Sequence, residues 1–178
     1  MADSLIPTKL LWVDLEMTGL NPDKDRIIEV AAIVSDWDFK ELQSYQAVIK
    51  QDDKLLAVMD EWNKTTHAKS GLLDKIPGGI TEAEAEDKLV GLIEQTFGED
   101  PVVLVGNSIY FDRRFIRHYW PKVEAKLHYR MLDVTAWKVV MQGKFNHVFE
   151  SKDAHRALDD IRESMAELQD YLAYFQRG

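Results

Sequence analysis

The alternation of apolar and polar positions in the first part of the chain predicts three β-strands. The segment LLWVDLEM, residues 10–17, carries apolar side chains on both faces, and RIIEVAAIVS, residues 26–35, is mostly apolar and β-branched. This pattern is typical of strands that are covered on both sides. Residues 39–49 alternate more clearly and predict a more exposed strand. Because only residues 36–38 separate the second and third strands, we expect a hairpin and an antiparallel arrangement.

Helical spacing prevails in most of the remaining chain. After an acidic cap at residues 52–53, Leu55, Met59 and Trp62 share one face of a predicted helix. A capping box, Thr81 to Glu84, begins another helix that runs to Phe97.

The second half of the chain predicts one more strand and three helices. VVLVGN, residues 102–107, fits a parallel core strand reached by a helical crossover. Helices are predicted over residues 107–119 and 132–141. The last helix has one continuous apolar seam, which consists of Leu158, Ile161, Met165, Leu168, Leu172 and Phe175. Three strands, a helical part, a fourth strand and further helices predict an α/β fold with a mixed sheet, in a single domain that spans residues 1–178.

Composition narrows the class of protein. A length of 178 residues and a hydrophobic content of 46% suit one globular domain. The absence of cysteine excludes disulfides and thiolate metal sites. A net charge of −9 argues against broad binding to long nucleic acid, although a few phosphate contacts can still hold a short one. No segment approaches a membrane span of about 18 apolar residues and no signal peptide is recognisable. We therefore expect a cytoplasmic protein that does not contact a membrane, or one whose targeting segment lies outside this sequence.

Carboxylates interrupt this apolar scaffold at three places. Asp14 and Glu16 point to the same face of the first strand, because side chains alternate along a strand. Asp112 follows the strand at residues 102–107, where ligand sites of open α/β sheets collect. At about 100° per residue, Asp160 lies at the border of the last helix's apolar seam and Asp159 points nearly away from it. The alternative for the first pair is a strand that simply reaches solvent.

Convergent carboxylates without cysteine suit a hard cation, Mg²⁺ or Mn²⁺ ahead of Zn²⁺. Two such ions would stabilise the attacking and leaving oxygens of a displacement at phosphorus. His155 is a candidate general base, because an imidazole titrates near neutral pH. On an ideal helix His155 and Asp160 diverge by about 140°, so both reach one site only if His155 precedes the regular helix. An ordinary surface histidine is the alternative.

These residues resemble the motifs of a known family. Asp14-x-Glu16, Asp112 and His155-x-Ala157-x-x-Asp160 are similar to the three exonuclease motifs of the DEDDh class, which has an RNase H-like fold. The segments WVDLEMTGL, MDEWNKTTHAKSGLL, GNSIYFDRRFI, HYRMLDV and HRALDDIRES resemble the oligoribonuclease family. The matching segments extend from about residue 10 to residue 172, and their combination is highly specific.

The resemblance implies a 3′→5′ exoribonuclease that degrades very short RNAs, chiefly dinucleotides, to 5′-mononucleotides. It also implies an RNase H-like mixed sheet, with three antiparallel strands followed by parallel strands and helices on both sides. Two divalent ions, Mg²⁺ or Mn²⁺, would be held by Asp14, Glu16, Asp112 and Asp160. His155 would be the general base that activates the attacking water.

The resemblance also assigns substrate contacts. Leu20 and Trp62 correspond to an apolar and aromatic pair that wedges against the bases, and His67 would line the same pocket. The alternative for Trp62 is a core residue, since it shares a predicted helix face with Leu55 and Met59. The residues that would bind the 5′ phosphate, and so measure substrate length, are Ser108, Arg130 and Thr135. Tyr129 resembles a residue that reaches the active site from a second subunit, which implies a homodimer.

One segment and one single residue depart from the family pattern. Residues 141–153 show no recognisable match immediately before His155, and Thr135 stands where serine is usual, although the hydroxyl is retained.

Two other functions remain open on the sequence. One is a DEDDh exonuclease for longer RNA or DNA 3′ ends, which a phosphate cap at Ser108, Arg130 and Thr135 would argue against. The other is a non-catalytic RNase H-like interaction module, against which the retained carboxylates and His155 argue.

Overall fold

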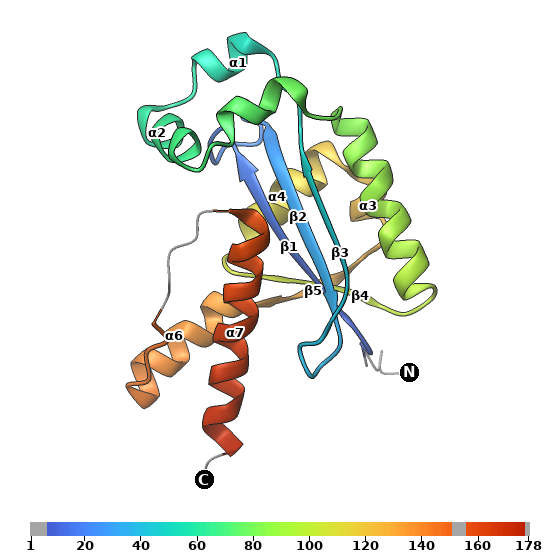
Figure 1. The fold of residues 1–178 in the computed structure, drawn as a ribbon. Helices are drawn as coiled ribbons and strands as arrows, with labels where there is room; N and C mark the ends of the chain where they lie inside the picture. The colour runs from blue at the N-terminus through green and yellow to red at the C-terminus, as the bar shows by residue number, and fades with distance from the viewer. Residues whose placement is uncertain (1–6, 151–155, 177–178) are drawn as a thin grey trace.

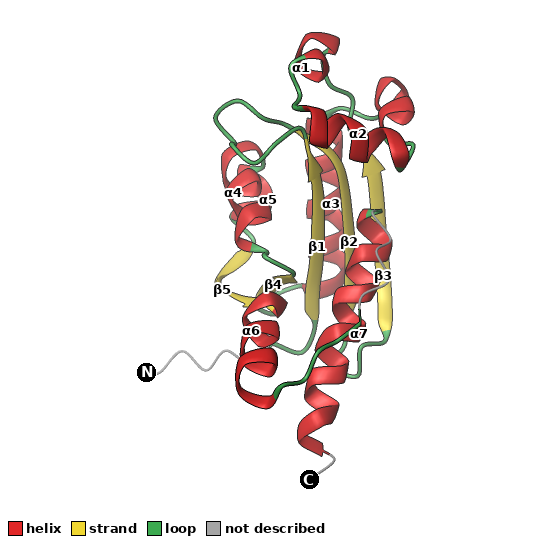
Figure 2. Ribbon diagram, turned by 90° about the vertical axis from the view of Figure 1, so that its left-hand side faces the viewer, coloured by secondary structure: helices red, strands yellow, loops and turns green. Residues whose placement is uncertain are grey.

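A computed structural model describes residues 7–150 and 156–176. Its centre is a five-stranded sheet with the strand order β3-β2-β1-β4-β5. The strands β1 (Leu10–Met17), β2 (Ile27–Ser35) and β3 (Glu41–Val48) are antiparallel. β4 (Val102–Gly106) pairs in parallel with β1, and β5 (Leu127–Asp133) pairs in parallel with β4 (Figure 2). The predicted mixed sheet of three antiparallel strands followed by parallel strands is therefore confirmed.

Helices cover both faces of this sheet, with the longest one, α7, on one face and α3 and α4 on the other (Figure 1). A group of short helices, α1, α2 and the 3₁₀ helix η1, lies at the end of the sheet where β1 finishes. The helices are α1 (Asp53–Ala57), α2 (Glu61–Lys69), η1 (Leu73–Gly78), α3 (Glu82–Phe97), α4 (Tyr110–Tyr119), α5 (Pro121–Glu124), α6 (Val134–Phe145) and α7 (Ala157–Gln176). None of these described helices is both long enough and apolar enough to span a bilayer.

Alternate residues of β1 contribute to two different hydrophobic cores. Leu11, Val13 and Leu15 pack in the core formed with α3, α4 and α5. Leu10 and Trp12 pack in the core formed with α6 and α7. Because the side-chain period of a strand is two residues, Asp14 and Glu16 continue the second row and face the side that α7 covers.

Two elements differ from the sequence prediction. The pattern Leu55, Met59, Trp62 does not define one helix, because α1 ends at Ala57 and Asp60 caps a new helix by accepting a hydrogen bond from the Asn63 N–H at 2.8 Å. The strand β5 was not predicted as a strand. It is the edge strand of the sheet, and its central residues are exposed, so it lacks the apolar run of a core strand.

The other predicted elements are present with shifted ends. The capping box at Thr81 and Glu84 is formed, with both of its hydrogen bonds. The helix expected over residues 132–141 begins later, at Val134, where Asp133 caps it. In α7 the predicted seam packs against the sheet as far as Leu172, but Phe175 is half exposed and contacts the rings of Trp137 and Phe145.

Candidate active site

Three carboxylates converge between the end of β1 and the start of α7. Asp14 and Glu16 come from the strand, and Asp160 comes from the first turn of the helix. One oxygen from each lies within 4.8 Å of the other two. Asp159, the other acidic residue of this turn, points outward and its side chain is 58% exposed. The alternation along β1 and the helical rotation along α7 thus bring these three acids together.

Asp112 approaches the same region from the opposite face of the sheet. It lies in the first turn of α4, it is buried, and its Oδ1 accepts a hydrogen bond from the Leu15 N–H at 2.9 Å. Its negative charge is one of the causes that raise the pKa of Asp14. Asp112 is not part of the group of three within 4.8 Å, so the structure places it beside Asp14 and not at the centre of the cluster.

Burial makes Asp14, Glu16 and Asp112 weak acids, and the repulsion of neighbouring carboxylates adds to this effect at Asp14 and Glu16. Burial, followed by the charges of Asp112 and Glu16, raises the pKa of Asp14 well above its usual value. Burial, followed by the charge of Asp160, raises the pKa of Glu16 to about 8. Burial raises the pKa of Asp112 to about 7. Close carboxylates of this kind either retain protons or need a cation, and oxygen ligands suit a hard divalent ion. The donor set therefore fits a divalent metal ion.

We expect the metal-free protein to lose stability between pH 7 and pH 9. The pKa of Glu16 is higher in the folded chain than in the unfolded chain, so the folded chain binds more protons in this window and its stability falls as pH rises. Burial lowers the pKa of His67, so this histidine makes stability rise with pH. That opposite effect occurs only below the ordinary pKa of histidine and therefore outside this window. In EDTA the Tm should fall by about 5 °C between pH 7 and pH 9.

The measurement is a pair of thermal melts, in EDTA and in saturating Mg²⁺. Binding of Mg²⁺ to the ionised carboxylates should remove most of the decrease, because a ligand of the folded state stabilises that state. A metal-free Tm that stays constant or rises over this window would contradict the described electrostatics.

His155, the candidate base, lies outside the described residues. The residue that follows it, Arg156, is described, and its Nη2 donates a hydrogen bond to Glu29 Oε1 at 3.1 Å. Arg156 also lowers the pKa of Glu16.

Two apolar side chains are displayed to solvent near the end of β1. Leu20, in the turn after β1, is 61% exposed, and Trp62, in the first turn of α2, is 72% exposed. The alternative interpretation of Trp62 as a core residue is therefore wrong. Trp62 is exposed because the helix breaks at Val58 and Met59, and this break turns Trp62 away from the face on which Met59 is buried.

His67 connects α2 to the acidic cluster. It is buried at the end of α2, its Nε2 forms a hydrogen bond with the Met17 carbonyl oxygen at 3.0 Å, and its Nδ1 lies 3.8 Å from Glu16 Oε2. Burial lowers the pKa of its imidazole. His67 thus holds α2, and with it Trp62, beside the end of β1.

Ser108 and Thr135 lie together beyond the ends of β4 and β5. The Ser108 N–H donates to Asp133 Oδ1 at 3.0 Å and to Thr135 Oγ1 at 2.9 Å, and the two hydroxyl oxygens are 3.1 Å apart. Ser108 has a φ of 48°, a left-handed conformation that this pair of contacts stabilises. Arg130 is not brought to them in the same way: it is exposed on β5, with its guanidinium 5.2 Å from the Tyr129 ring centre.

Some residues near the site were not identified from sequence. Asn107 accepts from the Thr135 hydroxyl at 3.3 Å and donates to Ser164 at 2.9 Å, which links the Ser108–Thr135 pair to α7. Glu29 is fully buried in β2. Its only sequence signal is a single charge inside the apolar run IIEVAAIV, and a lone charge does not reveal its partner.

Comparison with known families identifies this chain, with its sheet and its acidic cluster, as an exonuclease. Residues 11–168 match the family described as Exonuclease (RNase_T). The zinc-bound form of an Escherichia coli ExoI–ssDNA complex aligns with a TM-score of 0.72 at 15% identity, over 97% of this chain and 42% of that chain. Exonuclease I from Methylocaldum szegediense aligns with a TM-score of 0.68 at 18% identity, over 89% of this chain and 39% of that chain. At these identities the likeness shows the fold, which is RNase H-like as predicted.

Relatives of similar length narrow the family. The oligoribonuclease of Alkalilimnicola ehrlichii is 43% identical over 94% of this chain and 90% of its own length. That of Chromobacterium violaceum is 44% identical over 93% of this chain and 94% of its own. That of Pseudomonas aeruginosa is 42% identical over 95% of this chain and 97% of its own. The chain belongs to the oligoribonuclease family of exonucleases.

Proposed function

We propose that this enzyme is a metal-dependent 3′→5′ exoribonuclease that degrades very short RNA, chiefly dinucleotides, to 5′-mononucleotides. The observation that carries this proposal is the convergence of Asp14, Glu16 and Asp160, with Asp112 beside Asp14, in a chain 42–44% identical to oligoribonucleases over nearly its whole length. A non-catalytic module would have no reason to keep three half-buried carboxylates close together and a fourth, Asp112, buried beside them.

Asp14, Glu16, Asp112 and Asp160 would hold two divalent ions, Mg²⁺ or Mn²⁺. When bound, such ions stabilise the negative charge on the attacking and leaving oxygens of a phosphodiester displacement. His155 would take a proton from the attacking water. Its position next to Arg156 in the sequence supports this role, because α7 begins there and carries Asp160 in its first turn.

Two groups of residues would select the substrate, one by contact with the bases and the other by contact with the 5′ phosphate. Leu20 and Trp62 would hold the bases by apolar contact and stacking, which ignores base identity and suits a mixed pool of fragments. His67 would line this pocket through its contact with Met17. The hydroxyls of Ser108 and Thr135 would bind the 5′ phosphate, and Arg130 can present its fork to the same group. A cap at the 5′ end would exclude long chains, which disfavours the alternative of an exonuclease for long RNA or DNA.

The test of this function is hydrolysis of a 5′-phosphorylated dinucleotide. With Mg²⁺ or Mn²⁺ the purified protein should convert it to mononucleotides, and EDTA should stop the reaction. Asp112→Ala should abolish turnover. Turnover that persists in this variant, after host nucleases have been removed, would overturn the assignment.

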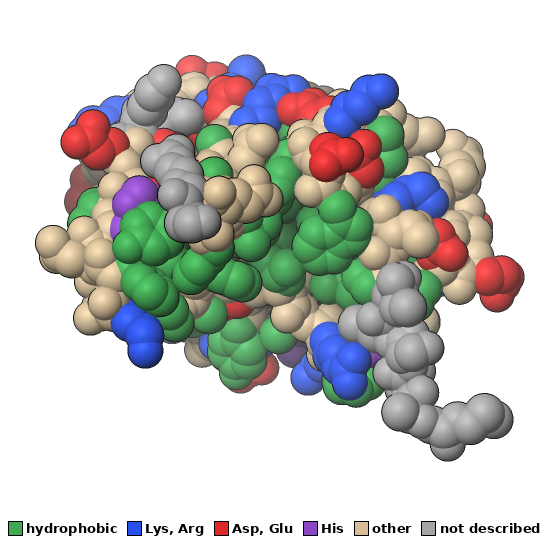
Figure 3. All heavy atoms as spheres, turned by 90° about the horizontal axis from the view of Figure 1, so that it is seen from below, with side chains coloured by type: hydrophobic (Ala, Val, Ile, Leu, Met, Phe, Trp, Pro, Cys, Tyr) green, Lys and Arg blue, Asp and Glu red, His purple; other side chains and the backbone are tan. Residues whose placement is uncertain are grey.

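We also propose that the enzyme is a homodimer assembled through β5 and α6. The edge strand β5 exposes Tyr129 and Met131, and α6 exposes Val139 and Val140. Figure 3 shows hydrophobic side chains gathered on the end of the molecule seen from below. Unpaired strand edges and clustered apolar side chains favour association with another chain. Tyr129 would then reach the active site of the second subunit.

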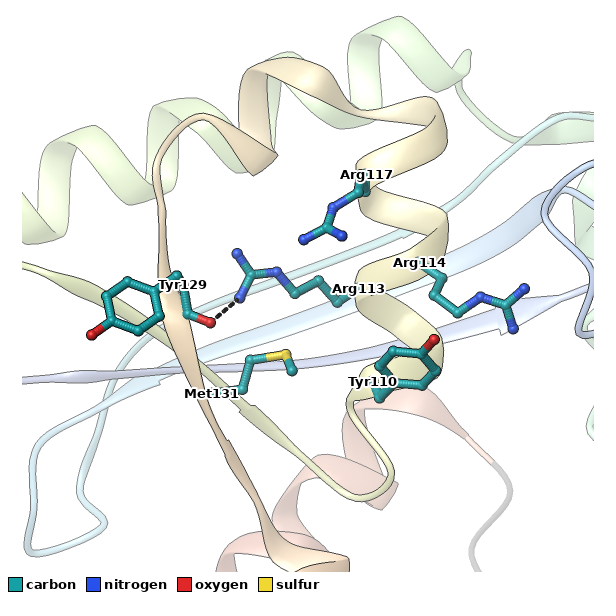
Figure 4. A pocket seen from close by; sticks show the side chains of 6 residues that line it. All are labelled: Tyr110, Arg113, Arg114, Arg117, Tyr129 and Met131. Carbon is teal, nitrogen blue, oxygen red and sulfur yellow. Dashed lines mark hydrogen bonds between the residues drawn. The ribbon is translucent and has the colours of Figure 1, made fainter.

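A small pocket beside β5 supports the proposal that this surface binds a second subunit. It has a volume of about 100 Å³ and lies between α4 and β5, where Arg113 donates a hydrogen bond to the Tyr129 carbonyl oxygen at 3.1 Å (Figure 4). The ring of Tyr129 itself points away from Arg113, so this side chain is available to a partner. The residues that line the pocket are Tyr110, Arg113, Arg114, Arg117, Tyr129 and Met131.

We expect Met131→Asp to convert a dimer to a monomer, because a charge in an apolar interface is costly to desolvate. Light scattering after size exclusion should give about twice the chain mass of 20.6 kDa for the wild type and the single mass for the variant. Val58→Asp is the matched control, since Val58 is 79% exposed on the loop after α1 and should leave the dimer intact. A wild-type monomer at micromolar concentration would refute the proposal.

The cytoplasmic location stays a prediction from the sequence.

A further inference from the structure

Glu29 is a buried carboxylate that the proposed reaction does not use. It is fully buried in β2 and lies directly opposite Glu16 in the antiparallel pairing of β1 with β2. Like charges directly opposite one another destabilise a sheet, and a buried ion pair is often less stabilising than apolar side chains of similar size. A leucine at this position would serve the core better. The carboxylate therefore requires a reason other than fold stability.

The partners of Glu29 tie it to the start of α7. Its Oε1 accepts hydrogen bonds from Arg156 Nη2 and from Gln46 Nε2, each at 3.1 Å. Its Oε2 and the Nε of Arg156 have no hydrogen-bond partner among the described residues. One charge-assisted contact thus joins the middle of the sheet to the residue immediately before the helix.

Arg156 is held at both of its ends. Its side chain is bonded to Glu29, and its carbonyl oxygen accepts the N–H of Asp160 at 2.9 Å and that of Asp159 at 2.8 Å. These are the first hydrogen bonds of α7. The first turn of a helix has few internal partners and frays readily. The two contacts of Arg156 form a continuous connection from Glu29 to the backbone of Asp160.

We propose that Glu29 is a positioning residue that acts through Arg156: it fixes the first turn of α7 so that Asp160 meets Asp14 and Glu16 in the arrangement a divalent cation requires. This inference rests on the proposed function. Residues that orient metal ligands typically change metal affinity or activity by about 10- to 100-fold when they are replaced.

A simple electric-field effect makes a different prediction. If Glu29 acted only as a nearby negative charge, its removal would weaken cation binding, and removal of the positive Arg156 would strengthen it. Removal of both charges would leave the local net charge unchanged and cation binding nearly unaffected. Positioning instead predicts that each replacement weakens cation binding and that the double replacement weakens it as well.

The deciding experiment measures the Kd for Mn²⁺ by calorimetric titration, in the absence of RNA, of the double variant Glu29→Gln/Arg156→Gln. This variant leaves no buried charge unpaired, so it avoids the main cause of misfolding in Arg156→Gln alone. The Kd for Mn²⁺ should rise at least 5-fold and kcat for a dinucleotide should fall about 10-fold. Arg156→Lys, which keeps the charge and can still donate to Glu29, should recover most of the Mn²⁺ affinity. The two effects of the single variants should be non-additive in the double variant.

The control is another ion pair that joins α7 to the sheet, between Arg162 of α7 and Glu41 of β3. Glu41→Gln removes the partner of Arg162, which holds α7 to β3 through hydrogen bonds of 2.8 and 3.2 Å, and this variant should bind Mn²⁺ within twofold of the wild type. A double variant that binds Mn²⁺ as the wild type does, or an Arg156→Gln variant that binds it more tightly, overturns the inference alone. A wild-type protein that binds no Mn²⁺ overturns the proposed function together with the inference.

Discussion

Asp14→Asn should lower kcat/KM for a dinucleotide by at least about 100-fold and, at the same time, make the metal-free protein more stable. Asp14 is surrounded by acids: burial and the charges of Asp112 and Glu16 raise its pKa. A neutral amide of the same shape removes that repulsion, and it also removes a ligand that carries charge. The loss of activity and the gain in stability have one cause, because the site concentrates negative charge that only a cation compensates.

The measurements are steady-state kinetics in Mg²⁺ and thermal melts in EDTA at pH 8. We expect the metal-free Tm of Asp14→Asn to rise by about 2–6 °C. Asp159→Asn is the matched control on α7, since Asp159 is 58% exposed and does not belong to the cluster, and it should leave both quantities nearly unchanged. An Asp14→Asn enzyme with more than a tenth of wild-type activity would show that Asp14 is not a metal ligand.

Trp62→Ala should raise KM for dinucleotides by about 5- to 100-fold without loss of stability. The first effect follows from the loss of one base-stacking contact, worth about 1–3 kcal/mol. The second follows from the exposure of Trp62, because a side chain that is 72% exposed contributes little to the core. Trp62→Phe keeps an aromatic face and should retain most of the affinity.

The control for this prediction is a second exposed tryptophan. Trp37 lies in the β2–β3 turn, near the opposite end of the sheet, and its Nε1 donates to the Pro7 carbonyl oxygen. Trp37→Ala should leave KM unchanged. If Trp62→Ala changes the Tm but not KM, Trp62 has a structural role and the proposed wedge with Leu20 is wrong.

Much of the fold follows from strictly local patterns. The two faces of β1 could be predicted because the side-chain period of a strand is fixed, so the apolar residues 10–13 also determine where Asp14 and Glu16 point. The capping box at Thr81 could be predicted because its two hydrogen bonds join residues that are three apart. The outward direction of Asp159 followed from the helical rotation per residue.

The features that could not be predicted depend on tertiary context. β5 contains polar residues because it is an edge strand, and its place in the sheet is known only once β4 lies beside it. Helical spacing continued from Leu55 through Met59 to Trp62 across two separate helices, because apolar periodicity does not reveal a break where Asp60 can cap. That break decides the exposure of Trp62.

The same limit applies to the surroundings of the site. Glu29 and Arg156 are 127 positions apart, so no periodicity connects them, and their pairing depends on how α7 crosses the sheet. The contact of His67 with Met17 likewise joins residues 50 positions apart. The resemblance to oligoribonucleases supplied the candidate residues, and the structure supplied the contacts through which they can act.

The most direct test of the central claim is a comparison of 5′-phosphorylated RNAs of 2, 3, 5 and 20 nucleotides under one set of conditions with Mg²⁺, with the Asp112→Ala protein as the background. A 5′-phosphate cap at Ser108 and Thr135 and a base wedge at Leu20 and Trp62 predict that kcat/KM is greatest for the dinucleotide and at least about 100-fold lower for the 20-mer. Equal or greater efficiency on the 20-mer would contradict the account and identify a general exonuclease of the same fold.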